Sequence, residues 1–319
     1  MSFVIFAHHF ERLFDSLRQQ LASGGDMITE ERRGNAWPDL FVPSHLQIGL
    51  PFQTAIYGDK SEILRFARRK ASGSDPKIEE PHQHAYEKAR GVVYHDFVLG
   101  TIENAKNAIS HANQTKTLDL VRTLRRKRAS LIEKRGRTIQ GLSPRLRKSI
   151  RISSSKVLEF ETLLVNACVN YWIACKPNMS LTSILHSALP VIVDHKITFP
   201  QMGLAGDITP DFVFPQWHAV GELKTGKPDA RHKLALAAYS LAYEKQHNQN
   251  IDFGVILYLD VPGAKTPTYK IDAFVVSDVY RSSFLELRND RLKLVRKEME
   301  RLAKQKKGTI KSKDTGLQS

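Results

Sequence analysis

The feature that most constrains this chain is a change of pattern near residue 190. Beyond that point, short runs rich in Val, Ile, Phe and Tyr are bounded by Gly, Pro and Asp, which is typical of strands separated by turns. We predict strands at Pro190–Phe199, Asp207–Phe214, Trp217–Lys224, Ile251–Leu259 and Tyr269–Val276. Between the third and fourth strands, Arg231–Gln246 has apolar residues at helical spacing, and a last helix is expected from Ser277 to about Lys307. This order predicts an α/β core.

The first 180 residues predict a mainly helical region instead. An amphipathic helix is expected within residues 1–24, ending at Gly24-Gly25. Further helices are expected near Ser61–Lys70, from about Gln83 to Asn113, and through much of 116–175. We therefore expect a helical region over 1–180, an α/β core with a C-terminal helix over 181–307, and a charged tail over 308–319.

Positive charge is concentrated in one part of this helical region. The whole chain carries a net charge of +15, and the stretch 116–156 has 14 basic residues against two acids. The stretch could be a solvated face, but such dense like charge repels itself, and binding to a polyanion relieves that repulsion. We expect a DNA contact here. The candidate DNA-binding residues are Arg125, Arg126, Lys127, Arg128, Arg145, Arg147 and Lys148.

Several classes of protein are disfavoured by composition. The longest apolar stretch, Leu163–Cys175, contains two asparagines and is too short to span a bilayer. The chain has only two cysteines, Cys168 and Cys175, which cannot form a disulfide framework and fit a reducing compartment. The first residues lack the basic and apolar regions of a secretory signal. We expect a soluble, cytoplasmic protein with no membrane partner.

The pattern that points to chemistry is an acid near the end of one predicted strand and an acid-x-lysine on the next. Asp211 follows Pro210, and ten residues separate it from Glu222, which is followed two positions later by Lys224. Strand side chains alternate between faces, so Glu222 and Lys224 point the same way, and a hairpin through Pro215-Gln216 would bring Asp211 beside them. Two carboxylates form an oxygen-rich site suited to Mg²⁺ or Mn²⁺. A lysine beside them could orient water and stabilise a phosphoryl oxygen.

Acid-x-lysine also arises by chance, and the chain contains two other instances. Asp75-Pro-Lys77 lies in a Gly, Ser and Pro loop. Asp194-His-Lys196 lies in a predicted strand, but no acid occurs on a plausible preceding hairpin strand. We therefore favour Glu222 and Lys224 over both.

Together these residues resemble the PD-(D/E)xK nucleases. Pro210-Asp211 followed by Glu222-Leu-Lys224 is the pattern of that superfamily, and the helix leading to Tyr239 is similar to its RecB-type branch. Gly91-Val-Val-Tyr-His95 resembles the helical histidine of that branch. Three more segments resemble the archaeal type I-A branch of CRISPR-associated RecB-like exonucleases, family four in the Cas nomenclature: Arg33–Pro38, Leu234–Tyr239 and Phe284–Asp290.

The resemblance implies a role for each matching residue. His95, Asp211 and Glu222 would hold Mg²⁺ or Mn²⁺, with the backbone carbonyl of Leu223 as a further ligand. Lys224 would position the attacking water, and Tyr239 would approach the DNA backbone. The implied reaction is hydrolysis of phosphodiester bonds at DNA ends, and the implied pathway is CRISPR adaptation, in which spacer precursors are processed alongside the integrase.

The chain departs from the family at two places. Family members hold a [4Fe–4S] cluster with four cysteines, and two cysteines cannot do so, so we expect no iron–sulfur cluster. The final helix then needs another anchor, for which we predict its apolar stripe of Leu287, Leu292, Leu294, Val295 and Leu302. The glutamine found four residues before the tyrosine is Ala235 here.

Three functions remain open at this point. The first is a metal-dependent DNA exonuclease of CRISPR adaptation. The second is a non-catalytic subunit that keeps the fold and binds DNA or the integrase, which the lost cysteines and glutamine favour. The third is a restriction or repair nuclease outside CRISPR.

Overall fold

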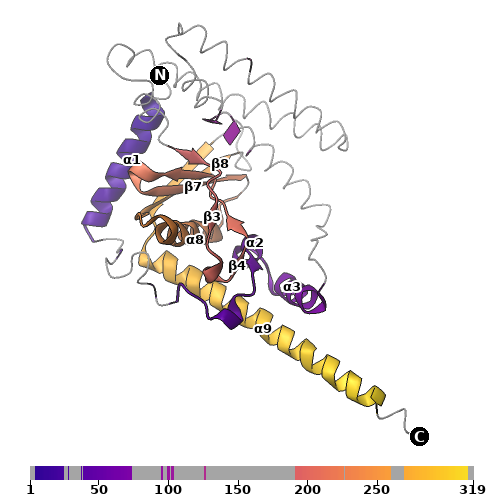
Figure 1. Cartoon of the computed structure of the whole chain (residues 1–319). Coiled ribbons are helices and arrows are strands. Elements are labelled where there is room, and N and C mark those ends of the chain that lie inside the picture. The colour runs from indigo at the N-terminus through magenta and orange to yellow at the C-terminus, as the bar shows by residue number, and fades with distance from the viewer. Residues whose placement is uncertain are drawn as a thin grey trace.

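The computed structural model describes residues 4–24, 28, 37, 39–73, 95, 99–100, 102–103, 126, 191–225, 227–259 and 269–314 (Figure 1). The described residues His95, Leu99 and Ile102 are helical, as expected for Gln83–Asn113. The predicted boundary near residue 180 and both cysteines lie outside the described residues. Within the described part, no helix combines the length and the apolar surface that crossing a bilayer requires.

The centre of the fold is a five-stranded mixed sheet in the order β2-β6-β7-β8-β9. Strands β7 and β8 run parallel, and the other neighbours are antiparallel. The α/β prediction is therefore confirmed. The strands of this sheet are β2 (Ile192–Val193), β6 (Phe212–Phe214), β7 (Ala219–Thr225), β8 (Phe253–Leu259) and β9 (Tyr269–Val275).

Helix α8 (Ala230–His247) connects the two parallel strands, and it confirms the helix predicted there. The Asp229 side chain caps its first turn by accepting from the backbone N–H of Arg231. Residues 235–244 are buried on every side of the helix, as expected for a helix in the interior of a fold.

The two faces of the sheet are covered by different helices. Adjacent strand residues point to opposite faces. On β8, a side chain at Gly254 would meet Leu236 of α8, whereas Phe253 packs against Phe14 of α1 (Val4–Ala22) with ring centroids 5.7 Å apart. Helices α1 and α8 therefore lie on opposite faces of the sheet.

Two predicted strands are each broken in the structure, which corrects the sequence analysis. Pro190–Phe199 divides into β2 and β3 (Ile197–Thr198), and Asp207–Phe214 divides into β5 (Asp207–Ile208) and β6. The outer parts β3 and β5 pair with each other in a separate two-stranded sheet. Pro210 explains the break between β5 and β6, because it lacks the backbone N–H that a continuous ladder needs. The break between β2 and β3 begins at Asp194, whose φ of 49° is not that of a strand.

The N-terminal segment 39–73 packs on the same core rather than apart from it. It contains η3 (Ser44–Leu46), β1 (Leu50–Pro51), α2 (Phe52–Ile56) and α3 (Lys60–Ser72). Strand β1 pairs with β4 (Leu204–Ala205). Two short 3₁₀ turns, η4 (Pro200–Met202) and η5 (Pro215–Trp217), precede β4 and β7 in the chain. Phe52 and Ile63 belong to the same hydrophobic cluster as Leu236 and Ile256.

The last helix, α9 (Asp278–Asp314), confirms the predicted helix and continues past Lys307. Figure 1 shows it as a long yellow helix that passes below α8 and then beside α3. Of its predicted apolar stripe, Leu292 and Val295 are fully buried, whereas Leu287, Leu294 and Leu302 are only partly buried.

Two buried arginines of α9 provide anchors that the apolar pattern did not reveal. Arg281 donates to both carboxylate oxygens of Glu244 at 2.7 and 2.9 Å, and both side chains are almost fully buried. Arg288 donates to the backbone carbonyls of Leu40, at 3.0 Å, and Asp39. Burial lowers the pKa of Arg288 to about 10. Helix α9 is thus tied to α8 and to the N-terminal segment by polar contacts inside the protein.

We expect Arg281→Met to lower the free energy of unfolding by about 3–5 kcal/mol, because it leaves the carboxylate of Glu244 buried without the guanidinium that neutralises its charge. The control is Arg296→Met on the same helix, which breaks an exposed pair with Glu300 and should cost under about 1 kcal/mol. Urea denaturation followed by circular dichroism measures both. Equal losses would contradict the anchoring role of Arg281.

Candidate functional site

The break between the paired strands places two aspartates opposite each other. The ladder of β2 and β6 pairs Ile192 with Val213 and Val193 with Phe212, so the next residues in register are Asp194 and Asp211. The backbone N–H of Asp194 still donates to the carbonyl of Asp211 at 3.3 Å. Asp194 has a φ of 49°, which ends regular pairing at this point. The two carboxylates therefore meet where the sheet is interrupted.

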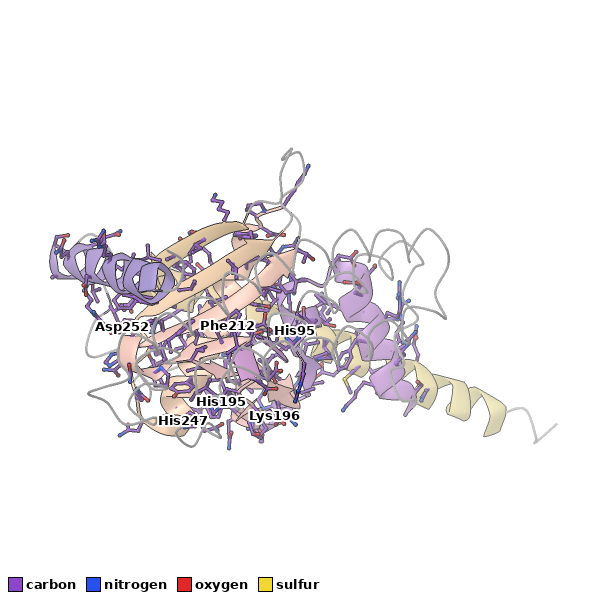
Figure 2. All side chains as sticks on the ribbon, turned by 90° about the horizontal axis from the view of Figure 1, so that it is seen from above. His95, His195, Lys196, Phe212, His247 and Asp252 are labelled. Atoms are coloured by element: carbon purple, nitrogen blue, oxygen red, sulfur yellow. The ribbon has the colours of Figure 1, made fainter. Side chains whose placement is uncertain are left out.

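Asp211 is the most constrained residue of the site. Its side chain is nearly buried, its Oδ1 lies 2.9 Å from His95 Nε2, and its Oδ2 accepts from the backbone N–H of Leu223 at 2.6 Å. Figure 2 shows His95 beside the part of the sheet that carries Phe212, the residue after Asp211. The proposed convergence of His95 and Asp211, far apart in sequence, is present in the structure.

Asp194 completes this group, although the sequence analysis set it aside. Its Oδ1 lies 3.5 Å from His95 Nε2. One ligand atom from each of His95, Asp194 and Asp211 lies within 4.8 Å of the other two. A histidine nitrogen and two carboxylate oxygens could hold a divalent ion such as Mn²⁺ or Mg²⁺.

The electrostatics of this group favour a cation. Two carboxylates directly opposite each other repel. Burial raises the pKa of Asp194, attraction to His95 lowers it, and the charge of Asp211 raises it, with a net upward direction. Burial opposes charge on His95, but hydrogen bonding and attraction to Asp211 outweigh this and raise its pKa. A positive charge at this point offsets the repulsion between the paired acids, and a divalent cation could supply it.

Glu222 and Lys224 lie next to this group on β7. In the parallel ladder Glu222 is beside Ile256 and Lys224 is beside Tyr258, so the two side chains share one face of the sheet, as their spacing predicts. This is the face that α8 covers, because a side chain at Gly254 on the same strand as Ile256 would meet Leu236. Lys224 donates to Glu222 Oε1. Glu222 is not one of the three residues within 4.8 Å of one another, but its Oε2 is buried without a hydrogen-bond partner in the described part of the chain.

Burial and charge act in opposite directions on this pair. Burial raises the pKa of Glu222, while the ammonium of Lys224 lowers it, and the net direction is upward. Burial acts to lower the pKa of Lys224, but the carboxylate of Glu222 and neighbouring groups raise it above its ordinary value. Lys224 is therefore held as an ammonium beside a buried carboxylate.

The other predicted site residues lie around this centre. The contact that Leu223 makes with Asp211 is through its N–H, and the role of its carbonyl stays a prediction. Tyr239 is 2% exposed and its ring stacks on Phe52, with centroids 4.9 Å apart. Burial raises the pKa of the Tyr239 hydroxyl well above its usual value, and the negative charges of Glu222 and Asp211 raise it further. Its contact with DNA also stays a prediction.

The predicted DNA-binding residues are mostly beyond the structural description. Arg126 is helical and exposed. The other six lie outside the described residues: Arg125, Lys127, Arg128, Arg145, Arg147 and Lys148. The DNA contact of this stretch stays a prediction.

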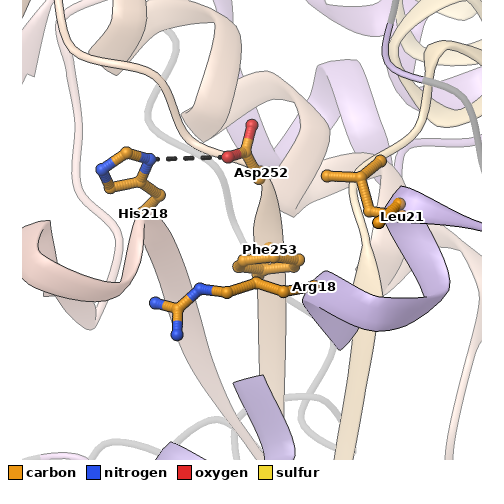
Figure 3. Close-up of a pocket in the computed structure, with 6 residues that line it drawn as sticks. Arg18, Leu21, His218, Asp252 and Phe253 are labelled. Carbon is orange, nitrogen blue, oxygen red and sulfur yellow. Dashed lines mark ion pairs between the residues drawn. The ribbon is translucent and has the colours of Figure 1, made fainter. Parts of the chain in front are cut away.

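One cavity lies away from this chemistry. It has a volume of about 320 Å³ and is lined by Arg18, His218, Asp252 and Phe253 among others (Figure 3). His218 precedes the first residue of β7, at the opposite end of the strand from Lys224. His218 Nδ1 lies 3.5 Å from Asp252 Oδ2 across it. None of the predicted catalytic or metal-binding residues lines this cavity.

Comparisons with known proteins point in the same direction as the site. The model of a family described as CRISPR-associated exonuclease Csa1 matches residues 6–303. A protein of that description from Saccharolobus solfataricus is 32% identical over 112 residues, covering 35% of this chain and 38% of the relative. One from Thermoproteus tenax is 35% identical over 77 residues, covering 24% and 27%. The matched segments thus span well under half of either relative.

We expect Asp194→Asn to weaken Mn²⁺ binding at least about tenfold, because it removes one of two opposed carboxylates, and a tenfold loss corresponds to about 1.4 kcal/mol. Isothermal titration calorimetry measures the affinity. The control is Asp207→Asn on β5, which alters an exposed carboxylate bonded to Thr198. Unchanged binding in Asp194→Asn, or an equal loss in both variants, would remove Asp194 from the metal site.

Proposed function

Since this chain belongs to the family of CRISPR-associated RecB-like exonucleases described as Csa1, we propose that it is a metal-dependent DNA exonuclease with a PD-(D/E)xK core. One observation carries the proposal: His95, Asp194 and Asp211 converge beside the Glu222–Lys224 pair. Carboxylates and a histidine can bind a divalent metal, and a partly buried lysine beside them can stabilise the charge that develops in phosphodiester hydrolysis.

The donor set supports Mg²⁺ or Mn²⁺ as the metal. His95, Asp194 and Asp211 would hold it, and the buried Oε2 of Glu222 and the carbonyl of Leu223 are further candidate ligands. Carboxylate and carbonyl oxygens suit these ions. When bound, such an ion stabilises negative charge on a phosphoryl oxygen and lowers the pKa of water.

The chain's own groups supply the remaining functions. Asp211 is fixed by the N–H of Leu223 and by His95, so its carboxylate is oriented before any ligand arrives. Lys224 keeps its proton beside Glu222, so its ammonium can orient the attacking water and stabilise charge on the phosphoryl oxygens. Preorganised charges of this kind lower the barrier because they need no rearrangement during reaction.

DNA is the proposed substrate, and CRISPR adaptation the proposed setting. The relatives in Saccharolobus solfataricus and Thermoproteus tenax are described as CRISPR-associated exonucleases. The net charge of +15, concentrated in 116–156, supports binding of a polyanion. In this proposal the protein processes spacer precursors, and the CRISPR integrase complex is the proposed partner.

One observation favours a second candidate, a non-catalytic DNA- or integrase-binding subunit. Ala235 replaces the glutamine of the broader family and is fully buried, so this position cannot donate a hydrogen bond to a DNA end. The complete set of His95, Asp211, Glu222 and Lys224 opposes that candidate. A restriction or repair nuclease outside CRISPR is disfavoured by the family match.

Cleavage of end-labelled DNA with Mn²⁺ tests the proposal. We expect metal-dependent cutting by the intact protein and a loss of about 10³-fold or more in both Lys224→Ala and Glu222→Gln. The first variant removes the ammonium that stabilises charge on the phosphate, and the second removes a carboxylate proposed to bind the metal. Lys245→Ala is the control, since Lys245 lies in the last turn of α8 and its ammonium is over the ring of Phe41. DNA binding without cutting, unchanged by either substitution, would leave the binding subunit as the function.

A further inference from the structure

Tyr57, at the end of α2, lies close to Lys224 and Glu222, the pair to which the proposed reaction assigns charge stabilisation and metal binding. The Nζ of Lys224 is 5.3 Å from the centroid of the Tyr57 ring, within the range of a cation–π interaction. The guanidinium of Arg231 is 5.7 Å from the same ring. The hydroxyl oxygen of Tyr57 is buried and makes no hydrogen bond to the described residues.

The position of Tyr57 is fixed from two sides. Arg231 of α8 donates to the carbonyl of Tyr57 at 3.1 Å. Arg291 of α9 donates to the carbonyl of Thr54, one turn earlier in the chain, at 2.6 Å. The ring also meets His232 edge-on, with centroids 5.9 Å apart. A side chain fixed in this way can impose a position on the flexible side chain of Lys224.

The state of Glu222 gives the reason for such a contact. In this structure Glu222 Oε1 accepts from Lys224, and its Oε2 has no partner in the described part. If Glu222 binds a metal ion, its carboxylate is shared between the ion and the ammonium of Lys224, which weakens the closest ion pair of Lys224 in a largely buried environment. A weakly paired buried cation is costly, so a second group is needed to hold it.

We propose that Tyr57 is a positioning residue for Lys224: its ring and hydroxyl hold the ammonium in place when Glu222 binds the metal. The inference rests on the nuclease function proposed above. It also accounts for the hydroxyl, because a buried O–H without a partner destabilises the fold unless it gains one in another state. A phenylalanine would keep the ring and avoid that cost, but could not accept from the ammonium.

The test compares two substitutions at this position. Tyr57→Phe keeps the ring and removes the acceptor, so we expect kcat for DNA cleavage with Mn²⁺ to fall about tenfold. Tyr57→Leu removes both, and we expect a fall of about a hundredfold. KM for DNA should stay within about twofold in both, since Tyr57 acts through Lys224 and not on the bound strand.

Tyr280→Phe and Tyr280→Leu are the matched controls. Tyr280 is also a half-buried tyrosine near a lysine, Lys233, at 5.7 Å, but it packs on Phe274 of β9. These variants should keep kcat. Equal losses at Tyr57 and Tyr280, or an effect of Tyr57→Leu on KM alone, would overturn the inference.

A second measurement separates this inference from the nuclease proposal. If the intact protein does not cleave DNA, the proposed function fails, and the Tyr57–Lys224 contact is tested by unfolding instead. We expect the effects of Tyr57→Leu and Lys224→Met on urea denaturation to be non-additive, because the two side chains are in contact. Additive effects would overturn the contact itself.

Discussion

Asp194 and Asp211 lie opposite each other where the pairing of β2 and β6 ends, and their mutual repulsion is the constraint on which the site depends. Regular pairing would leave like charges facing each other across a ladder, which destabilises a sheet. The interruption at Pro210, the helical His95 and the N–H of Leu223 together make the arrangement tolerable. A divalent cation would satisfy it more fully, since it neutralises both carboxylates. The same distortion that weakens the edge of the sheet therefore creates the candidate metal site.

Buried contacts elsewhere in the fold position Tyr239 and Tyr57 near the candidate metal site. Helix α8 presents Tyr239 behind Glu222, and Arg281 of α9 fixes α8 through the buried carboxylate of Glu244. Arg288 and Arg291 of α9 bind backbone carbonyls of the segment 39–73, which carries Tyr57. Buried ion pairs and buried guanidinium groups give little net stability, but removing one partner is costly, so they specify one arrangement of the helices. The position of the N-terminal segment beside Lys224 follows from these contacts.

Local sequence patterns suffice to predict the core. The roles of Asp194, Arg288 and Tyr57 depend on contacts between distant segments and are not predicted by such patterns. The spacing of Glu222 and Lys224 and the turn before β7 sufficed to place Asp211 beside them, because hairpin geometry is local. A hairpin with a preceding strand does not identify Asp194, because its partner Asp211 lies on a strand that follows it in the chain; pairing with the following strand does identify it. The contacts by which Arg288 anchors α9 to the N-terminal segment are to backbone carbonyls, and no sequence pattern predicts such contacts. Tyr57 reaches the site only through the packing of α2 on α8 and α9, which no periodicity encodes.

The most direct test of the metal centre is X-ray diffraction from crystals grown with Mn²⁺, using the anomalous signal of the ion. The account predicts a peak within coordination distance of His95 Nε2 and of one oxygen each from Asp194 and Asp211. With the ion in place, the side chain of Glu222 should turn its free oxygen toward it and leave Lys224 against Tyr57. A protein that binds Mn²⁺ elsewhere, or that keeps the two aspartates facing each other with no ion between them, would contradict the account.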